Sequence, residues 1–464
     1  MRRTLVLVPV LASLIAPAAA SAGTAQMVFT PGDDRTPSSE EFKYAAGPGE
    51  ANRFTLQEAD GTALLVIDSA GVTLGRNCTR PVPGDTTRAR CTTTEESSVI
   101  EFSVTLGDLD DVGTSTTEVT GSISGGPGND NLTAPTLDGG EGNDVLKGSV
   151  SIKGGPGNDD MTGAPNNNGS DGVTFHEGDA NNGSDTIRGQ NGGDEFGGDE
   201  VSYAGRAEAI RADLRGDRDD GAAGENDMIG ANVESITGGN GNDVLTANKK
   251  DNRLVGSEGA DTLNAGAGDD VLYAGYSNVQ SRSRTKDELN GGPGDDTLQG
   301  SRGANRLNPG TGRDSVTAGR GADVVLARDR SVDRISCGQG RDGLRVDRLD
   351  FFGLGCERAR RRGLAAAVPL GLAVFNTGEL PYAEIGCSGD APRRCRGTVT
   401  AIFKGRVLSR KRFSVRRGRV GDVNVLGART RVEGKTVRLR VRSRDRRGRV
   451  RQVTVPAFVD PDAG

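Results

Sequence analysis

A nine-residue spacing of glycine, aspartate and apolar residues constrains this chain more than any other feature. The phrase reads Gly-Gly-x-Gly-x-Asp-x-U-x, where U is a large apolar residue, and residues 238–245 (GGNGNDVL) give a clear copy. Asp243, Asn252, Asp261 and Asp270 then follow at steps of nine, each with a leucine two residues later. A period held over tens of residues indicates a solenoid, in which each repeat buries its apolar side chain against its neighbours.

The residue types within the phrase point to a hard cation. A second register carries Asp296, Asn305, Asp314 and Asp323. Glycine adopts positive φ cheaply, so each turn can curl tightly and direct several peptide carbonyls into one space. Calcium takes roughly 6–8 oxygen ligands and accepts carbonyls beside carboxylates, so an aspartate that closes the turn completes such a site. The alternative interpretation is a set of solvated acidic turns that hold no ion.

These repeats resemble those of the RTX, or haemolysin-type, calcium-binding family over roughly residues 120–345. The resemblance implies a parallel β-roll, with Ca²⁺ as the bound ion and the aspartate and glycine carbonyls of each phrase as its ligands. Carried onto the sixth position of each phrase, the ligand role falls on Asp130, Asp144, Asp159, Asp185, Asp194, Asp243, Asp261, Asp270, Asp296, Asp314 and Asp323. Asn252 and Asn305 lack the carboxylate, so we expect their turns to bind weakly or not at all.

The spacing also predicts how the coils differ along the roll. Between Ile123 and Met161 only alternate turns are full phrases, which predicts coils of about 14 to 15 residues with Asp130, Asp144 and Asp159 along one edge. Later coils should have about 18 residues, with phrases on both edges. Residues 197–237 break the period as an insert, whose acidic stretch 219–227 is a second, weaker candidate for an ion.

The N-terminal residues and the cysteines indicate an exported protein. Residues 1–22 combine an arginine pair, an apolar run and a small-residue cleavage site, which is typical of a secretory signal peptide, so we expect a secreted, extracellular protein. A membrane anchor is the rival interpretation, but the run is too short to span a bilayer. Six cysteines in three near-neighbour pairs predict disulfides. They allow fifteen connectivities, of which local pairing is the simplest; zinc binding is the alternative, without a CxxC spacing to support it.

The fold class we expect is all-β, with the roll flanked by smaller β units. Short alternating runs predict a β unit over residues 23–119, before a roll at 120–326. Residues 327–362 read as a disulfide-pinned cap, because a solenoid end must be covered. Residues 363–464 show hairpin-like alternation and predict a β-sandwich-like domain.

Charge is divided unevenly between these parts. Residues 120–325 hold 34 acidic and 17 basic residues, whereas residues 363–464 hold 8 acidic and 22 basic. The basic domain is either a solvated arginine-rich surface or a patch for anionic polymers of the cell envelope or matrix. Nucleic-acid binding by base stacking is disfavoured, because the chain has no Trp.

We expect no enzymatic activity. The chain has one histidine, His176, in a divergent stretch, and it lacks HExxH, GxSxG and GxxxxGK[ST] motifs. The favoured function is a secreted calcium-binding protein whose roll folds on meeting extracellular Ca²⁺, with a structural or adhesive role. The alternative is a polysaccharide-modifying enzyme that carries this roll, since paired carboxylates are also the residues of glycosidases.

Overall fold

The protein is described by a computed structural model, in which every regular element of the described residues is a β-strand. The described residues are 22–30, 39–60, 63–93, 101–165, 172–178, 182–190, 198–276, 284–346, 350–352, 356, 367–373, 382–387, 394–404, 406–416, 419–424, 435–444 and 450–459. Asp194 and the expected signal peptide, apart from Ala22, lie outside them. The chain divides into two compact units, residues 1–146 and 147–464.

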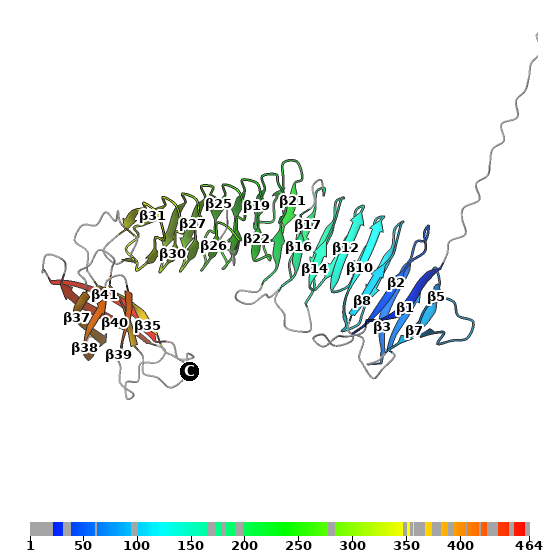
Figure 1. Cartoon of the computed structure of the whole chain (residues 1–464), viewed down its shortest axis with the longest axis horizontal. Helices are drawn as coiled ribbons and strands as arrows, with labels where there is room; N and C mark the ends of the chain where they lie inside the picture. The colour runs from blue at the N-terminus through cyan, green and yellow to red at the C-terminus, as the bar shows by residue number, and fades with distance from the viewer. Residues whose placement is uncertain are drawn as a thin grey trace, which may run out of the picture. The chain divides into compact units, whose positions relative to one another are not determined.

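In the first unit, antiparallel hairpins lead directly into parallel coils (Figure 1). One sheet contains β1 (Gly23–Thr30), β2 (Ser39–Ala45), β5 (Val72–Leu74), β8 (Glu101–Thr105), β10 (Thr120–Pro127) and β12 (Thr136–Glu141). The other contains β3 (Arg53–Asp60), β4 (Ala63–Asp68), β6 (Cys78–Thr79), β7 (Arg88–Thr92), β9 (Val112–Ser115), β11 (Asn131–Thr133) and the start of β13 (Val145–Gly148). Because β8 pairs in parallel with β10, the pairing continues across residue 119.

The second unit contains the long part of the roll, built from parallel ladders of three- to six-residue strands with a two-residue strand at one end (Figure 1). The first ladder runs through β14 (Ser151–Lys153), β16 (Thr174–His176), β18 (Glu200–Ser202), β22 (Ser235–Thr237), β24 (Arg253–Val255), β26 (Val271–Tyr273), β28 (Thr297–Gln299), β30 (Ser315–Thr317), β32 (Arg334–Ser336) and β34 (Phe351–Phe352). A second comprises β15 (Asp160–Gly163), β17 (Thr186–Arg188) and β21 (Asp227–Ile229), with β20 (Arg218–Asp220) antiparallel to β21. A third comprises β19 (Arg211–Asp213), β23 (Val244–Thr246), β25 (Thr262–Asn264), β27 (Glu288–Pro293), β29 (Arg306–Thr311), β31 (Val324–Ala327) and β33 (Gly343–Val346).

The core of the roll is a stack of single aliphatic side chains. Leu254 pairs in register with Leu272, and Leu272 with Leu298, and all three are fully buried. The middle residue of each three-residue strand points inward because side chains alternate between the two faces of a strand. The predicted parallel β-roll is therefore confirmed, and a low apolar content suffices because each half-coil needs one large inward side chain.

The C-terminal part forms two small antiparallel sheets, which confirms the antiparallel pattern expected there. One contains β35 (Ala367–Ala373), β36 (Tyr382–Cys387) and β39 (Arg419–Asn424). The other has the order β38 (Arg406–Arg416), β37 (Arg394–Phe403), β40 (Lys435–Arg444) and β41 (Val450–Val459).

The cysteines pair locally, as the simplest sequence interpretation predicts. The disulfides are Cys78–Cys91, Cys337–Cys356 and Cys387–Cys395. Within the described residues, no helix has the length and apolarity needed to cross a membrane.

Candidate calcium sites

The phrase aspartates form ladders along the edges of the roll. The Asp243 amide donates to Oδ1 of Asp261 at 3.0 Å, one coil further on, and the Asp296 amide donates to Oδ1 of Asp314 at 2.9 Å. In the first unit, the Asp130 amide donates to Oδ1 of Asp144 at 2.8 Å, across the predicted 14-residue step. One carboxylate oxygen of each aspartate is thus used to tie adjacent coils together.

In most of these aspartates, the second carboxylate oxygen has no donor among the described residues. Within the described residues, Oδ2 is buried and accepts no hydrogen bond in Asp130, Asp185, Asp261, Asp270, Asp296, Asp314 and Asp323. It points at the first glycine of its own turn, since a Cβ on Gly256 or Gly291 would lie 2.4 Å from Oδ2 of Asp261 or Asp296. A buried, unpaired carboxylate is strongly unfavourable, so this arrangement calls for a cation.

The turn carbonyls supply further oxygens beside these carboxylates. Gly292 and Gly310 adopt φ of 125° and 105°, and a Cβ on Gly310 would lie 1.9 Å from the Gly292 carbonyl oxygen. Only glycine permits both this φ and this close stacking of one turn on the next. Carboxylate and carbonyl oxygens gathered between coils match the ligands that Ca²⁺ prefers, so the residues present fit the ion.

The electrostatics of the roll agree with this assignment. Burial, followed by the charge of neighbouring aspartates, raises the pKa of Asp261 to about 8. Burial likewise raises the pKa of Asp130, Asp270, Asp314 and Asp323 to about 7. Without a cation, ionising these carboxyl groups at neutral pH works against the fold.

Ten of the eleven predicted ligands lie at ladder positions. Asp130 and Asp144 stack in the first unit, and Asp159 donates its amide to Asp185 in the second. Asp243, Asp261 and Asp323 occupy one edge of the longer roll, and Asp270, Asp296 and Asp314 occupy the other. Asp194 lies outside the described residues. Asp243 differs from most of the others because its Oδ2 accepts the Gly239 amide at 2.8 Å.

The ladders also include aspartates that the phrase did not identify. These are Asp111, Asp199, Asp227, Asp287, Asp333 and Asp342, each accepting a backbone amide from the preceding coil. Most lack the full glycine pattern, so a search for the whole phrase misses them. The signal that remains is an apolar residue two positions later, as in Asp287–Leu289 and Asp333–Ile335.

In the two asparagine turns, Oδ1 keeps its place in the hydrogen-bond ladder, but an Nδ2 amide group replaces the second carboxylate oxygen. Oδ1 of Asn305 accepts the Asp287 amide at 3.2 Å, as an aspartate would. Its Nδ2 donates to the carbonyls of Gly303 at 3.3 Å and Ala318 at 3.5 Å. Nδ2 of Asn252 similarly donates to the Glu234 carbonyl at 3.2 Å. An amide N–H therefore satisfies carbonyls that an ion would otherwise approach, which supports the prediction of weak binding.

The acidic insert loop brings Asp213, Asp219 and Asp220 together, with carboxylate oxygens within 4.8 Å of one another. Oδ1 of Asp220 accepts the Asp213 amide at 2.5 Å, and its Oδ2 accepts the Ile229 amide at 3.0 Å. Both oxygens of Asp220 are thus already engaged in holding the loop.

The basic C-terminal sheet carries a continuous exposed surface of arginines, here called the arginine face. It consists of Arg394, Arg396, Arg410, Arg412, Arg416, Arg440, Arg442 and Arg444, all exposed. Arg412 and Arg442 both lie opposite Thr398 on adjacent strands, so they share one side of the sheet. The four strands contain no aspartate or glutamate.

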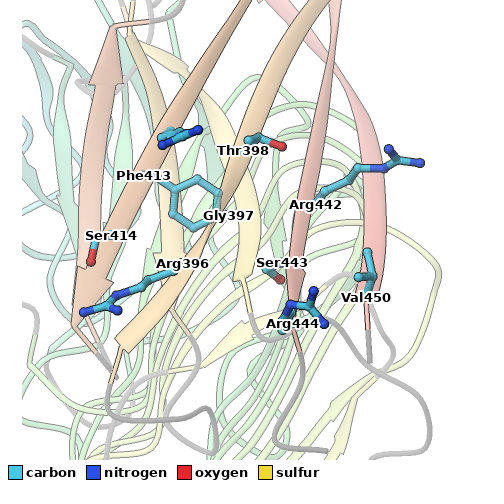
Figure 2. A pocket seen from close by; sticks show the side chains of 10 residues that line it. Arg396, Gly397, Thr398, Phe413, Ser414, Arg442, Ser443, Arg444 and Val450 are labelled. Atoms are coloured by element: carbon cyan, nitrogen blue, oxygen red, sulfur yellow. The ribbon is translucent and has the colours of Figure 1, made fainter. Parts of the chain in front are cut away.

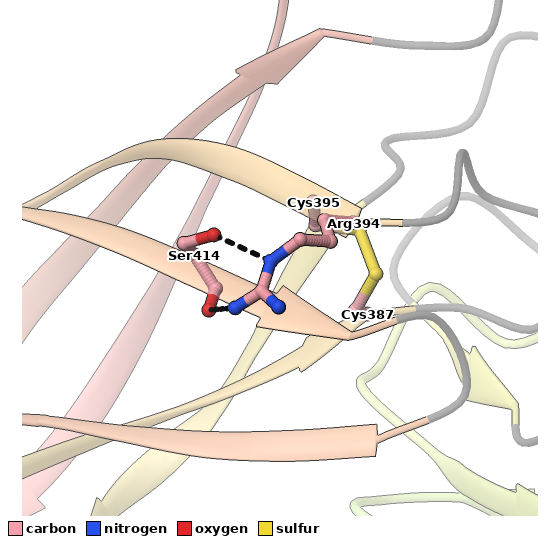
Figure 3. Close-up of a disulfide and its surroundings, with 4 residues drawn as sticks. All are labelled: Cys387, Arg394, Cys395 and Ser414. Atoms are coloured by element: carbon pink, nitrogen blue, oxygen red, sulfur yellow. Dashed lines mark hydrogen bonds between the residues drawn. A yellow bond between two sulfur atoms is a disulfide. The ribbon is translucent and has the colours of Figure 1, made fainter.

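An open hollow of about 650 Å³ lies on this sheet (Figure 2). Arg396, Arg442 and Arg444 border it, and the buried Ser443 hydroxyl, which has no hydrogen-bond partner in the described residues, lies among them. Nearby, the Cys387–Cys395 disulfide joins β36 to β37, and Arg394 donates to Oγ and the carbonyl of Ser414 at 2.9 and 3.0 Å (Figure 3). The hollow combines guanidinium and hydroxyl donors, which suit an oxyanion.

His176 lies on β16 with its ring 3.0 Å from the Ser151 hydroxyl. Partial burial of the ring lowers its pKa. The hydroxyl partner of the ring therefore lies on β14, the strand that pairs with β16.

Comparison with known proteins supports the calcium assignment. A family model described as the RTX calcium-binding nonapeptide repeat matches four stretches of the chain, residues 138–169, 228–255, 247–275 and 290–325. No curated protein matches the chain.

Proposed function

This chain is an RTX calcium-binding nonapeptide repeat protein with a Ca²⁺-binding β-roll, and on that premise we propose that the roll folds on meeting extracellular Ca²⁺ and then serves a structural or adhesive role. The observation that supports the coupling of folding to calcium is the row of buried Oδ2 atoms without donors. Each independent site adds about 2.7 kcal/mol to the stability of the folded state when Ca²⁺ is at a hundredfold excess over Kd. Several such sites would decide whether the roll is folded.

The extracellular setting fits this role. The RTX repeats and the three disulfides suggest an extracellular protein, because disulfides persist in oxidising compartments. We propose that residues 1–22 direct secretion and are then removed. Folding would then follow export, when the chain passes into a calcium-rich medium.

Calorimetric titration of the calcium-stripped protein tests the binding role. We expect more than one Ca²⁺ per chain, and fewer in an Asp270→Asn/Asp314→Asn variant, whose substitutions lie on the same edge of the roll. The matched control is Glu288→Gln, because Glu288 is 45% exposed and pairs with Arg306 outside the ladders. Equal stoichiometry in all three proteins would remove the phrase aspartates from the proposed ligand set.

We further propose that adhesion uses the arginine face and anionic polymers. Arginine forms bidentate hydrogen bonds with carboxylate or sulfate, and each charge-assisted hydrogen bond contributes roughly 1.5–3 kcal/mol. Neighbouring strands lie about 4.8 Å apart, so the face presents a close grid of cations to an extended chain.

Retention on an immobilised uronate polymer measures this adhesion. Arg412→Gln with Arg442→Gln should weaken binding by at least about tenfold at low salt. Lys43→Gln, which removes an exposed cation from β2, should not change it. Adhesion through this face is ruled out if the double variant binds as tightly as the unmodified protein.

We also propose that the protein is not an enzyme, because the ladders already account for most of its buried carboxylates. Incubation with uronate polymers tests this directly, and no chain cleavage or epimerisation is expected. Turnover that survives Asp261→Ala and Asp270→Ala but is abolished by replacing another carboxylate would favour the polysaccharide-modifying alternative.

A further inference from the structure

The region between residues 170 and 227 is not matched by the repeat model, yet one aspartate ladder ends there and another begins. The ladder through Asp159 and Asp185 ends at Asp227, which accepts the Asp185 amide at 2.9 Å. The ladder of Asp243 begins beside it, where the Ile210 amide donates to Asp243. The insert therefore joins two rows of calcium phrases.

Glycines are sparse in the turns of this junction. The five residues before Asp227 are Ala222-Ala223-Gly224-Glu225-Asn226, with one glycine where the full phrase has three. Gly183, in the turn before Asp185, keeps a φ of 101°. Fewer glycines mean fewer peptide carbonyls turned toward the space between coils, so side chains must supply the missing oxygens.

Glu177 reaches into this space from the end of β16. It is 1% exposed, its Oε2 accepts the Asn182 amide, and its Oε1 has no hydrogen-bond partner of ordinary geometry among the described residues. The carboxyl group of Asp185 lies within hydrogen-bonding reach of Glu177, and Oδ2 of Asp185 is also buried without a donor. When both groups are ionised, two acceptor-only carboxylates therefore face each other.

The Tyr203 hydroxyl is a second, independent sign of an absent ligand. Tyr203 is fully buried, and its hydroxyl lies within reach of the Asp227 carboxylate but makes no hydrogen bond of ordinary geometry within the described residues. The charges that act on it most strongly are the carboxylates of Asp227 and Glu177, which, after burial itself, raise its pKa. A buried hydroxyl directed at carboxylates gives a cation one more oxygen.

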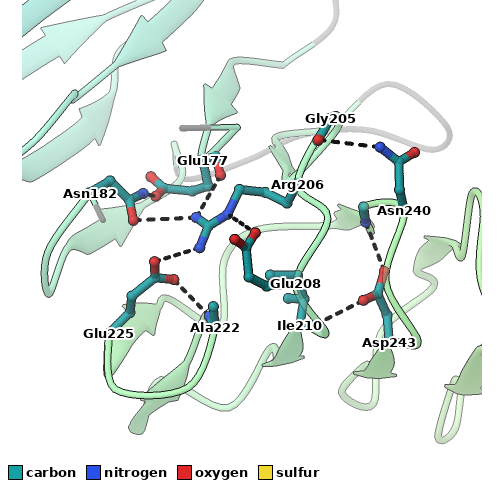
Figure 4. A network of polar contacts seen from close by, with 11 residues as sticks. Glu177, Asn182, Gly205, Arg206, Glu208, Ile210, Ala222, Glu225, Asn240 and Asp243 are labelled. Atoms are coloured by element: carbon teal, nitrogen blue, oxygen red, sulfur yellow. Dashed lines mark hydrogen bonds and ion pairs between the residues drawn. The ribbon is translucent and has the colours of Figure 1, made fainter. Parts of the chain in front are cut away.

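Arg206 is buried at this junction, where its side chain lies among those of Glu177, Asn182 and Glu225 (Figure 4). Its guanidinium donates to Oε1 of Glu225 at 2.5 Å and to the Glu177 carbonyl at 3.1 Å. Oε2 of Glu225 in turn accepts the Ala222 amide at 2.7 Å. One guanidinium cannot balance the four carboxylates of Glu177, Asp185, Glu225 and Asp227, so negative charge remains.

We propose that Glu177 joins Asp185 in holding a Ca²⁺ at this junction, bordered by Asp227 and the Tyr203 hydroxyl, and that Arg206 and Glu225 position the loop around it. This junction site rests on the proposed calcium-binding function of the roll. It differs from the phrase sites because side-chain carboxylates replace glycine carbonyls. The higher charge of a two- or three-carboxylate site should favour trivalent as well as divalent hard cations.

Terbium luminescence tests the junction site directly. The chain has no Trp, so sensitised Tb³⁺ emission must come from its five tyrosines, and Tyr203 borders the proposed ion. In the full-length protein, Tyr203→Phe should abolish the Tb³⁺ emission that Tyr203 sensitises, and Glu177→Gln should abolish the same emission. Glu177→Gln should also weaken Tb³⁺ binding at the junction site by roughly tenfold or more. Tyr203→Phe should leave the calorimetric number of bound ions unchanged, because it removes the antenna and one bordering oxygen only.

The rival occupant is a proton shared between Glu177 and Asp185. In that case Glu177→Gln would leave both Tb³⁺ emission and Ca²⁺ stoichiometry as they are, which would overturn the junction site. Glu288→Gln serves again as the exposed-glutamate control and should change neither signal. A calcium-dependent gain of β signal is measured separately by circular dichroism, so the junction site can fail while the calcium response of the phrase sites stands.

Discussion

At the scale of single residues, the two oxygens of most phrase aspartates have different tasks. In Asp261, Oδ1 accepts the amide of the preceding coil, whereas Oδ2 is buried without a donor. Asparagine can perform the first task but not the second, as Asn305 shows. The sequence predicted which phrase aspartates occupy the ladder positions. It did not predict the different roles of Oδ1 and Oδ2, because these roles depend on the register between coils.

Asp261→Asn should therefore act in opposite directions with and without calcium. Without Ca²⁺ it removes a buried carboxyl group whose ionisation opposes folding, and it should stabilise the roll by about 1–3 kcal/mol. With Ca²⁺ it should remove a ligand and raise the calcium concentration at the folding midpoint. Chemical denaturation in chelator and in calcium measures both effects. The control is Asp160→Asn in β15, whose side chain is 48% exposed and pairs with Arg188. If Asp261→Asn behaves like this control in both conditions, the assignment is contradicted.

The raised pKa values predict an unusual pH dependence for the calcium-free roll. Folded-state pKa values of about 7 for Asp314 and about 8 for Asp261 lie above the ordinary value of 3.8. The folded state then binds more protons than the unfolded state between about pH 4 and pH 8, so stability falls as pH rises through this window. Melting temperature in chelator should increase on acidification toward pH 5. A melting temperature that rises with pH in chelator would show that these carboxyl groups are not buried as described.

At the scale of elements, each turn is defined by glycines and each strand by one inward side chain. Strands such as β25 and β26 begin at the residue after their aspartate, so the Asp-x-apolar pattern correctly predicts where these strands begin. The same short signal marks Asp287 and Asp333, which the full glycine phrase excluded. Those positions were missed because the hydrogen-bond ladder requires only the carboxylate and the inward residue, whereas the glycines are required by the tight, closely stacked turns.

Gly312→Ala tests the stacking of turns. Gly312 has a φ of 142°, and an added Cβ would lie 1.7 Å from the Gly294 carbonyl oxygen. Gly205→Ala is a matched control, because Gly205 has a φ of 95° but nothing within 4 Å of an added Cβ. The control should lose about 1–2 kcal/mol from backbone strain alone. Gly312→Ala should lose at least about 1 kcal/mol more from the clash, measured by denaturation in calcium; equal losses would mean that the turns do not stack this closely.

At the scale of the whole molecule, the parts predicted from the sequence differ in charge, and they also differ in the direction in which their strands pair. Each disulfide lies within one of these parts. The local cysteine pairing and the antiparallel C-terminal sheet were predictable, because both depend on residues close in sequence. The continuation of parallel pairing from β2 through β8 to β10 was not, since alternating runs do not specify their partners. The arginine face required the register of β37, β38 and β40, which places its cations on one side of the sheet.

The most direct test of calcium-dependent folding is far-ultraviolet circular dichroism of the mature chain, followed by thermal melting, first in EDTA and then in millimolar Ca²⁺. We expect β signal to increase on adding calcium and a separate transition of the roll to shift to higher temperature. The C-terminal sheets, whose strands carry no acidic ladder, should change little. Identical spectra and identical melting in both solutions would contradict the claim that cations hold the aspartate ladders together.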